Sequence, residues 1–95
     1  MSLIVLTRFA IDPADAGELV TRHAALVEAQ RGTGLTNAGL GRIDDANWVG
    51  VWRWESAEHL AAVRAAPGPE AAHAFALVTD RSAITVEEIE LVDER

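Results

Sequence analysis

Residues 35–55 have the sequence LTNAGLGRIDDANWVGVWRWE, and this stretch decides the fold. Its two halves, 35–43 and 48–55, are rich in the apolar and aromatic side chains typical of strands. The Asp-Asp-Ala-Asn sequence between them favours a turn, because these side chains bond to their own backbone. We therefore predict a β-hairpin. A two-residue turn and a four-residue loop give the same register, in which Asn37 pairs with Trp54.

This register gives the hairpin two distinct faces. One face carries three indole rings, Trp48, Trp52 and Trp54, with Gly39, Gly41 and Gly50 among them. The other face is mostly aliphatic and carries Leu40, Val49, Val51 and Arg53. Neither face has the run of charge that is typical of a solvated surface, so we expect both faces to be covered.

The segments that flank the hairpin predict a β-α-β-β-α-β order. Residues 2–11 are apolar and β-branched, as in a buried strand, and a helix started by an Asp-Pro pair follows over about 13–31. A second helix begins after Ser56 and is split by a Pro-Gly-Pro sequence, with its second part at about 70–79. A last strand covers 82–92. The order predicts one ferredoxin-like α+β domain over all 95 residues, with a four-stranded antiparallel sheet and helices on one face.

The sheet face away from the helices is predicted to bind a second copy of the chain. A small domain without cysteine has no disulfides to stabilise it and gains burial by association. We expect a symmetric homodimer through the face that bears Leu40, Val49, Val51 and Arg53.

Composition excludes several classes of function. The net charge of −7 opposes binding to nucleic acid or to an anionic membrane. No apolar run reaches the ~20 residues that a bilayer requires, and no signal-peptide pattern is present, so we expect a cytoplasmic protein. The sequence has no Cys, Lys or Tyr, which excludes thiolate, Schiff-base and phenolic acid–base chemistry. The three histidines lack metal-ligand spacing, so we predict no metal site.

Residues 51–60, VWRWESAEHL, are followed by a proline break and by AAHAF at 71–75. This pattern resembles the antibiotic biosynthesis monooxygenase family, and the likeness covers essentially the whole chain. The resemblance implies a dimeric α+β barrel. It also implies oxidation of polycyclic phenols, anthrones or quinols by molecular oxygen without metal or flavin, although other members degrade haem.

The resemblance also assigns expected roles to individual residues. Trp54 matches the family's pocket-lining Trp at a strand end, and His73 matches the helix histidine that haem degraders use as iron ligand. Thr7 stands where those enzymes have Asn, and Val63 where they have Trp, so haem chemistry is disfavoured. Gly50 stands where the phenol-oxidising members have Asn.

The leading hypothesis is a cofactor-independent oxygenase of a small, electron-rich aromatic substrate. His73 is the first choice of base, His23 the second, and Asn37 is expected to bond to the substrate oxyanion. The predicted substrate-binding residues are Trp52, Trp54, Trp48, Thr7, Leu60, Val63 and Phe75. The alternatives are a non-enzymatic dimeric binding or accessory module and, less favoured, haem binding or degradation.

Overall fold

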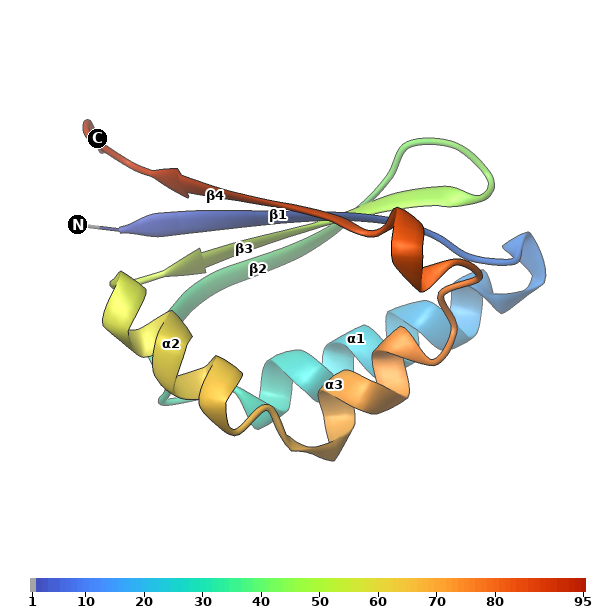
Figure 1. The fold of residues 1–95 in the computed structure, drawn as a ribbon, viewed down its shortest axis with the longest axis horizontal. Helices are drawn as coiled ribbons and strands as arrows, with labels where there is room; N and C mark the ends of the chain where they lie inside the picture. Colours follow the sequence, from blue (N-terminus) through green and yellow to red (C-terminus); the bar gives the residue numbers. More distant parts are fainter. Residues whose placement is uncertain (1) are drawn as a thin grey trace.

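In the computed structural model, residues 2–95 form a four-stranded antiparallel sheet covered on one side by helices (Figure 1). The elements are β1 (Leu3–Ala10), α1 (Ala16–Ala29), β2 (Leu35–Arg42), β3 (Asn47–Trp54), α2 (Ala57–Ala65), α3 (Gly68–Phe75) and β4 (Thr85–Glu90). Short 3-10 turns, Pro13–Asp15 and Arg81–Ala83, precede α1 and β4. The predicted ferredoxin-like α+β fold and its order of elements are confirmed.

Local hydrogen bonds explain where the helices begin. The Asp12 carboxylate accepts from the backbone N–H of Ala14 at 3.0 Å, directly before the turn that leads into α1. Ser56 Oγ accepts from the backbone N–H of His59 at 3.3 Å and so caps α2. Gly68, with a φ of +75°, is where the chain bends from α2 into α3. Between Ser2 and Arg95, no helix is long and apolar enough to cross a membrane.

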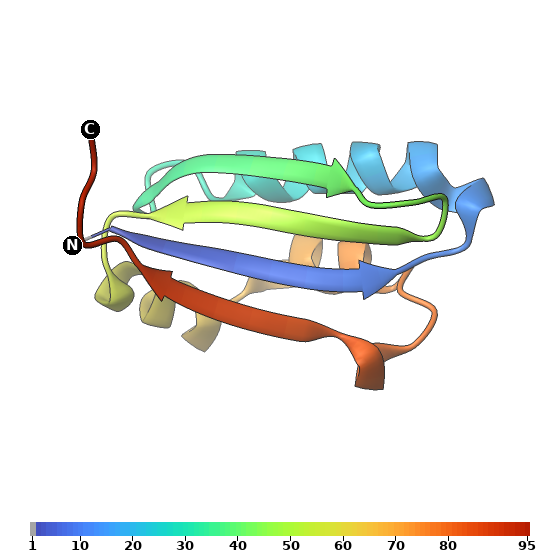
Figure 2. The same ribbon diagram turned by 90° about the horizontal axis from the view of Figure 1, so that it is seen from above.

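The strand order is β2-β3-β1-β4, and the helices lie behind the sheet in the view of Figure 2. Pairing between β1 and β3 sets the two faces, because side chains alternate along each strand. Thr7 lies opposite Gly50, and Val5 opposite Trp52. The helix-facing side of these two strands therefore carries Leu3, Val5, Thr7, Phe9, Trp48, Gly50, Trp52 and Trp54.

The predicted hairpin register is wrong by one residue. Leu40 pairs with Gly50, not with Val51, and Asn37 pairs with Arg53, not with Trp54. The physical reason is a loop of three residues, 44–46, closed by the Ile43 N–H donating to the Asn47 carbonyl at 2.8 Å.

The Asp44 side chain stabilises this loop. Its Oδ1 accepts from the backbone N–H groups of Ala46 at 3.0 Å and Asn47 at 2.8 Å. A shift of one residue turns the side chains of β2 from Asn37 onward to the other face, whereas an irregularity between Leu35 and Asn37 keeps Leu35 with the core on the helix side. Leu40 therefore lies on the helix side, whereas Asn37, Gly39 and Gly41 lie on the open side.

Two separate clusters form the core under the helices. Val5, Trp54 and Leu60 make one cluster, which Leu3, Leu35, Trp52 and Val63 extend. Ile11, Leu19 and Trp48 make the other, which Phe9, Ala16, Leu40 and Leu77 extend. Gly50 lies on the strand between Trp48 and Trp54 and contributes no side chain, so the middle of the face is left unfilled.

Candidate functional site

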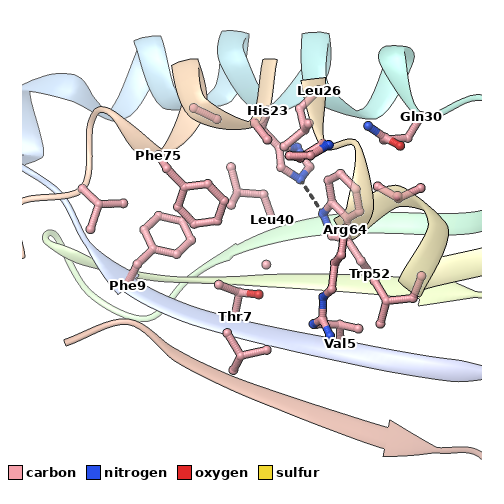
Figure 3. Close-up of a pocket in the computed structure, with 18 of the residues that line it drawn as sticks. Val5, Thr7, Phe9, His23, Leu26, Gln30, Leu40, Trp52, Arg64 and Phe75 are labelled. Carbon is pink, nitrogen blue, oxygen red and sulfur yellow. Dashed lines mark hydrogen bonds between the residues drawn. The ribbon is translucent and has the colours of Figure 1, made fainter. Parts of the chain in front are cut away.

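A cavity of about 310 Å³ lies between the sheet and the helices, and its walls include residues of both core clusters. This volume is at the lower end of the range for small-molecule sites. The walls are mainly apolar and include the aromatic rings of Phe9, Trp52 and Phe75 (Figure 3). Trp54 contributes a fourth ring. Exposed wall residues, among them Arg64, Pro67 and Val86, mark where the cavity meets solvent. Aromatic walls of this kind can stack against an aromatic ring.

Gly50 forms part of the cavity floor. A Cβ built at this position would meet nothing nearer than the Thr7 carbonyl at 3.9 Å. The glycine is therefore not required for packing, and its missing side chain leaves space between Thr7 and the indole of Trp52.

The cavity holds one histidine, His23, whose ring is bonded to Trp52. The indole Nε1–H donates to His23 Nε2 at 3.1 Å, and the two rings meet edge to face with centroids 5.7 Å apart (Figure 3). Since Nε2 accepts this hydrogen bond, the neutral imidazole carries its proton on Nδ1. Burial lowers the pKa of His23 from its ordinary value of 6.5, because desolvation penalises the charged form. The His23 ring is thus neutral at pH 7.

Three further polar side chains reach the cavity wall. Thr7 contributes from β1 and Gln30 from the C-terminal end of α1. Arg64 on α2 forms an ion pair with Glu88 of β4, so its guanidinium joins a helix to the edge strand. Hydroxyl, amide and guanidinium groups are not basic, so His23 carries the basic nitrogen among the described residues that line the cavity.

The structure places most of the predicted substrate-binding residues around this cavity. Trp52, Trp54, Thr7, Leu60, Val63 and Phe75 all line it. Trp48 does not line it. Its ring is buried in the second core cluster beneath the guanidinium of Arg42, which lies 5.8 Å from the ring centroid.

The predicted placement of His73 inside the pocket is wrong. His73 is exposed on α3, whereas Ala71, Ala74 and Phe75 of the same helix face the cavity. Helical spacing would place His73 on the same side as the partly buried Leu77, but α3 ends at Phe75, so this spacing does not extend to Leu77. The position that the resemblance implied for an iron ligand therefore lies outside the cavity.

The predicted placement of Asn37 beside Trp54 is also wrong. Asn37 is exposed on the open face, opposite Arg53, because of the shifted register. Its amide cannot reach a molecule between sheet and helices.

Gln30 and Arg64 are wall residues that the sequence did not single out as functional. Gln30 falls on the apolar stripe of α1, seven residues after His23, and a polar residue in such a stripe is a usable signal. Arg64 gives no such signal, because a surface arginine near a helix end is common.

Fold and cavity together define a ferredoxin-like α+β domain with a cavity between sheet and helices. The chain is similar in structure to Rv0793 from Mycobacterium tuberculosis (TM-score 0.74, 22% identity, 99% of this chain and 98% of that one). It is likewise similar to SnoaB, a cofactor-independent oxygenase from Streptomyces nogalater (TM-score 0.73, 22% identity, covering 98% of this chain and 95% of that one). An antibiotic biosynthesis monooxygenase is similar with a TM-score of 0.74 at 19% identity, covering 96% of this chain and 99% of that one.

These likenesses confirm, at the level of fold, the resemblance to antibiotic biosynthesis monooxygenases. Comparison of the sequence with protein-family models and with curated proteins gives no match.

Proposed function

We propose that this protein is a cofactor-independent oxygenase that oxidises a planar, electron-rich aromatic substrate of the phenol, hydroquinone or anthrone type. The observation that carries the proposal is a neutral histidine, His23, in an apolar cavity walled by aromatic rings. The similar structure of SnoaB, a cofactor-independent oxygenase, supports the same class of reaction.

The reaction begins with proton transfer from the substrate to His23. The substrate ring lies between the indoles and the helices, where offset stacking on Trp52 and Trp54 adds on the order of 0.5–1.5 kcal/mol per ring pair. His23 Nε2 accepts a proton from the acidic hydroxyl or activated C–H of the substrate. For this transfer the Trp52 N–H must release the lone pair of Nε2, and it then donates to the substrate oxyanion.

The substrate anion then reduces oxygen itself. It transfers one electron to O₂, and the resulting radical pair combines to a peroxide at the activated carbon. With an anthrone, the two methylene hydrogens and one oxygen atom leave as water, while the other oxygen atom remains as the new carbonyl. The apolar walls disfavour protonation of the anion by solvent.

Oxygen uptake with a panel of anthrones and hydroquinones in metal-free buffer tests the proposal. We expect consumption by the wild type and a loss of about 10²- to 10⁴-fold in kcat for His23→Gln, since a positioned base contributes about that factor. His59→Gln is the matched control, because His59 is exposed and bonded to Ser56. His73→Gln is also expected to retain activity. Loss of turnover in His73→Gln, with His23→Gln unaffected, would overturn the choice of base.

A second candidate function is a binding module for an aromatic metabolite. The observation that favours it is the Trp52–His23 hydrogen bond, which already occupies the lone pair that a base must use. The two functions differ in one measurement. If the protein is a binding module, an aromatic ligand quenches its indole fluorescence, but no member of the panel causes oxygen uptake.

A further inference from the structure

A second pocket, more open than the cavity, lies between the C-terminal end of α1, the helix α2 and the bend that leads into α3. Its volume is about 410 Å³, and we call it the outer groove. The residues that line it outside the cavity include Gly32, Thr33, His59, Ala66, Gly68 and Glu70. The reaction proposed above makes no use of this groove.

The outer groove and the cavity meet at three residues. Gln30, Val63 and Pro67 line both of them. Gln30 directly follows α1 and Val63 lies on α2, so the two hollows adjoin between these helices. Figure 3 shows Gln30 at the end of the cavity away from Phe9 and Phe75. A ring bound in the cavity can therefore carry a chain that extends into the groove at this end.

The two hollows differ in charge. Among the described residues, Arg64 is the charged side chain that lines the cavity, and it pairs with Glu88. The described wall of the outer groove contains no arginine and carries the carboxylate of Glu70. Glu70 Oε2 lies 3.1 Å from where a Cβ on Gly68 would be, so the missing side chain leaves room for this carboxylate. Between Ser2 and Arg95, no basic side chain forms an ion pair with Glu70.

Other groups at the groove also favour a positively charged ligand. Ala29 is the last residue of α1 and lines the groove, and the carbonyl groups at a helix C-terminus carry partial negative charge. His59 Nδ1 lies 2.7 Å from Ser56 Oγ, and its Nε2 lies 3.4 Å from the carboxylate of Glu55. This contact brings a second carboxylate close to the groove. The electrostatic preference of the groove is thus for a cation.

We propose that the cavity and the outer groove form one binding site for an aromatic amine, with the ring in the cavity and the protonated amino group beside Glu70. A short methylene chain passes between Gln30 and Val63 and joins the two ends of the ligand. The proposal rests on the proposed function for the aromatic ring and adds a charged group to the ligand. Glu70 is then a specificity-determining residue that lies apart from His23.

Three probes with the same ring and chain test the preference for charge. 4-Phenylbutylamine is a cation, 4-phenylbutanol is neutral and 4-phenylbutanoate is an anion. Titrations followed by NMR of the indole and amide N–H signals give both affinity and location. We expect the probes to shift the indole signals of Trp52 and Trp54, which line the cavity. The amine should also shift the backbone amides of Gly32 and Gly68 in the groove, while Trp48, which lines neither pocket, serves as internal reference.

We expect the wild type to bind the amine about fivefold more tightly than the alcohol, which corresponds to about 1 kcal/mol, the upper value for a partly exposed ion pair. In Glu70→Gln this preference should disappear while affinity for the alcohol stays unchanged. Glu58→Gln is the matched control, because Glu58 is also in the first turn of a helix but lines neither pocket. Ala66→Arg is a second variant, which adds a positive charge at an exposed position of the groove and should weaken binding of the amine. The NMR spectrum also reports whether each variant folds.

Several outcomes would overturn the proposal. These are equal binding of amine and alcohol by the wild type, a preference that Glu70→Gln retains, amine binding without shifts of Gly32 and Gly68, and no binding of any probe. Oxygen uptake with the aromatic panel, measured in parallel, separates this proposal from the oxygenase. Amine selectivity that depends on Glu70 without oxygen uptake supports the aromatic amine and contradicts the oxygenase. Oxygen uptake by a protein without amine selectivity does the reverse.

Discussion

At His23, burial and one hydrogen bond decide the chemistry of the side chain. Burial lowers its pKa, and the Trp52 N–H selects the neutral form because only neutral Nε2 can accept. His23 follows Leu19 by four residues and precedes Leu26 by three, so the helical period alone places it on the side of α1 that lines the cavity. Trp52, the hydrogen-bond partner of His23 on the sheet, comes close to it only in the folded chain.

Replacing Trp52 with Phe keeps an aromatic ring in the cavity and removes the N–H donor. We expect the pKa of His23 to rise toward 6.5, because the neutral form loses a hydrogen bond that the protonated form never makes. An NMR titration of the His23 ring signals measures the shift. Trp54→Phe is the control, since Trp54 makes no hydrogen bond to His23. An unchanged midpoint in Trp52→Phe would mean that burial alone sets the pKa.

The same lowered pKa makes stability depend on pH. In the unfolded chain His23 binds a proton below about pH 6.5, whereas in the fold it resists protonation until a lower pH. Its contribution to stability is therefore complete above pH 6.5 and is lost as the pH falls toward the folded-state pKa. In Trp52→Phe the folded-state pKa of His23 should lie closer to 6.5. As the pH falls, the free energy of unfolding of this variant should therefore decrease over a narrower pH range than that of the wild type.

At the scale of elements, the connection from α1 to β2 depends on glycine. Gly34 has a φ of +97°, a left-handed conformation that disfavours any residue with a Cβ. A Cβ there would also collide with the ring of His59 on α2, and the Gly34 carbonyl accepts from the Glu55 N–H at 2.8 Å. This one residue thus joins the end of α1 to both the end of β3 and α2.

We expect Gly34→Ala to lower the free energy of unfolding by about 1–3 kcal/mol, because backbone strain and the collision act together. Gly17→Ala is the matched control. Gly17 lies in the first turn of α1 with nothing near its missing Cβ, so alanine should raise stability by up to about 1 kcal/mol. Urea denaturation of both variants measures the difference. Equal stability of the two variants would contradict the role of Gly34.

At the scale of the whole molecule, the open face of the sheet is apolar and faces the viewer in Figure 2. It carries Ile4, Leu6, Val49, Val51 and Ile89. Its two arginines are paired within the chain, Arg8 with Glu87 and Arg53 with Glu94. We propose that a second copy covers this face in a symmetric homodimer, with Leu40 excluded from the interface by the corrected register.

Val51→Lys tests the dimer. Val51 is 39% exposed near the middle of the face, and a lysine there would place an unpaired charge in the interface. We expect a dimer for the wild type and a folded monomer for Val51→Lys in sedimentation velocity. Val20→Lys is the control, because Val20 is 52% exposed on α1 on the other side of the molecule. A monomeric wild type would rule out the proposed assembly.

The sequence by itself determines the strands, the helices, their caps and the topology, because these follow from short-range patterns and the capping chemistry of residues such as Asp12 and Ser56. It also identifies Trp52 and Trp54 as pocket walls. Only the tertiary structure decides which face of β2 meets the helices, since the three-residue loop set by Asp44 turns Asn37 outward and Leu40 inward. It alone decides between His23 and His73, because α3 turns Ala71, Ala74 and Phe75 toward the cavity and leaves His73 exposed. Side-chain direction reverses with a shift of one residue, and such a shift depends on contacts that are distant in the sequence.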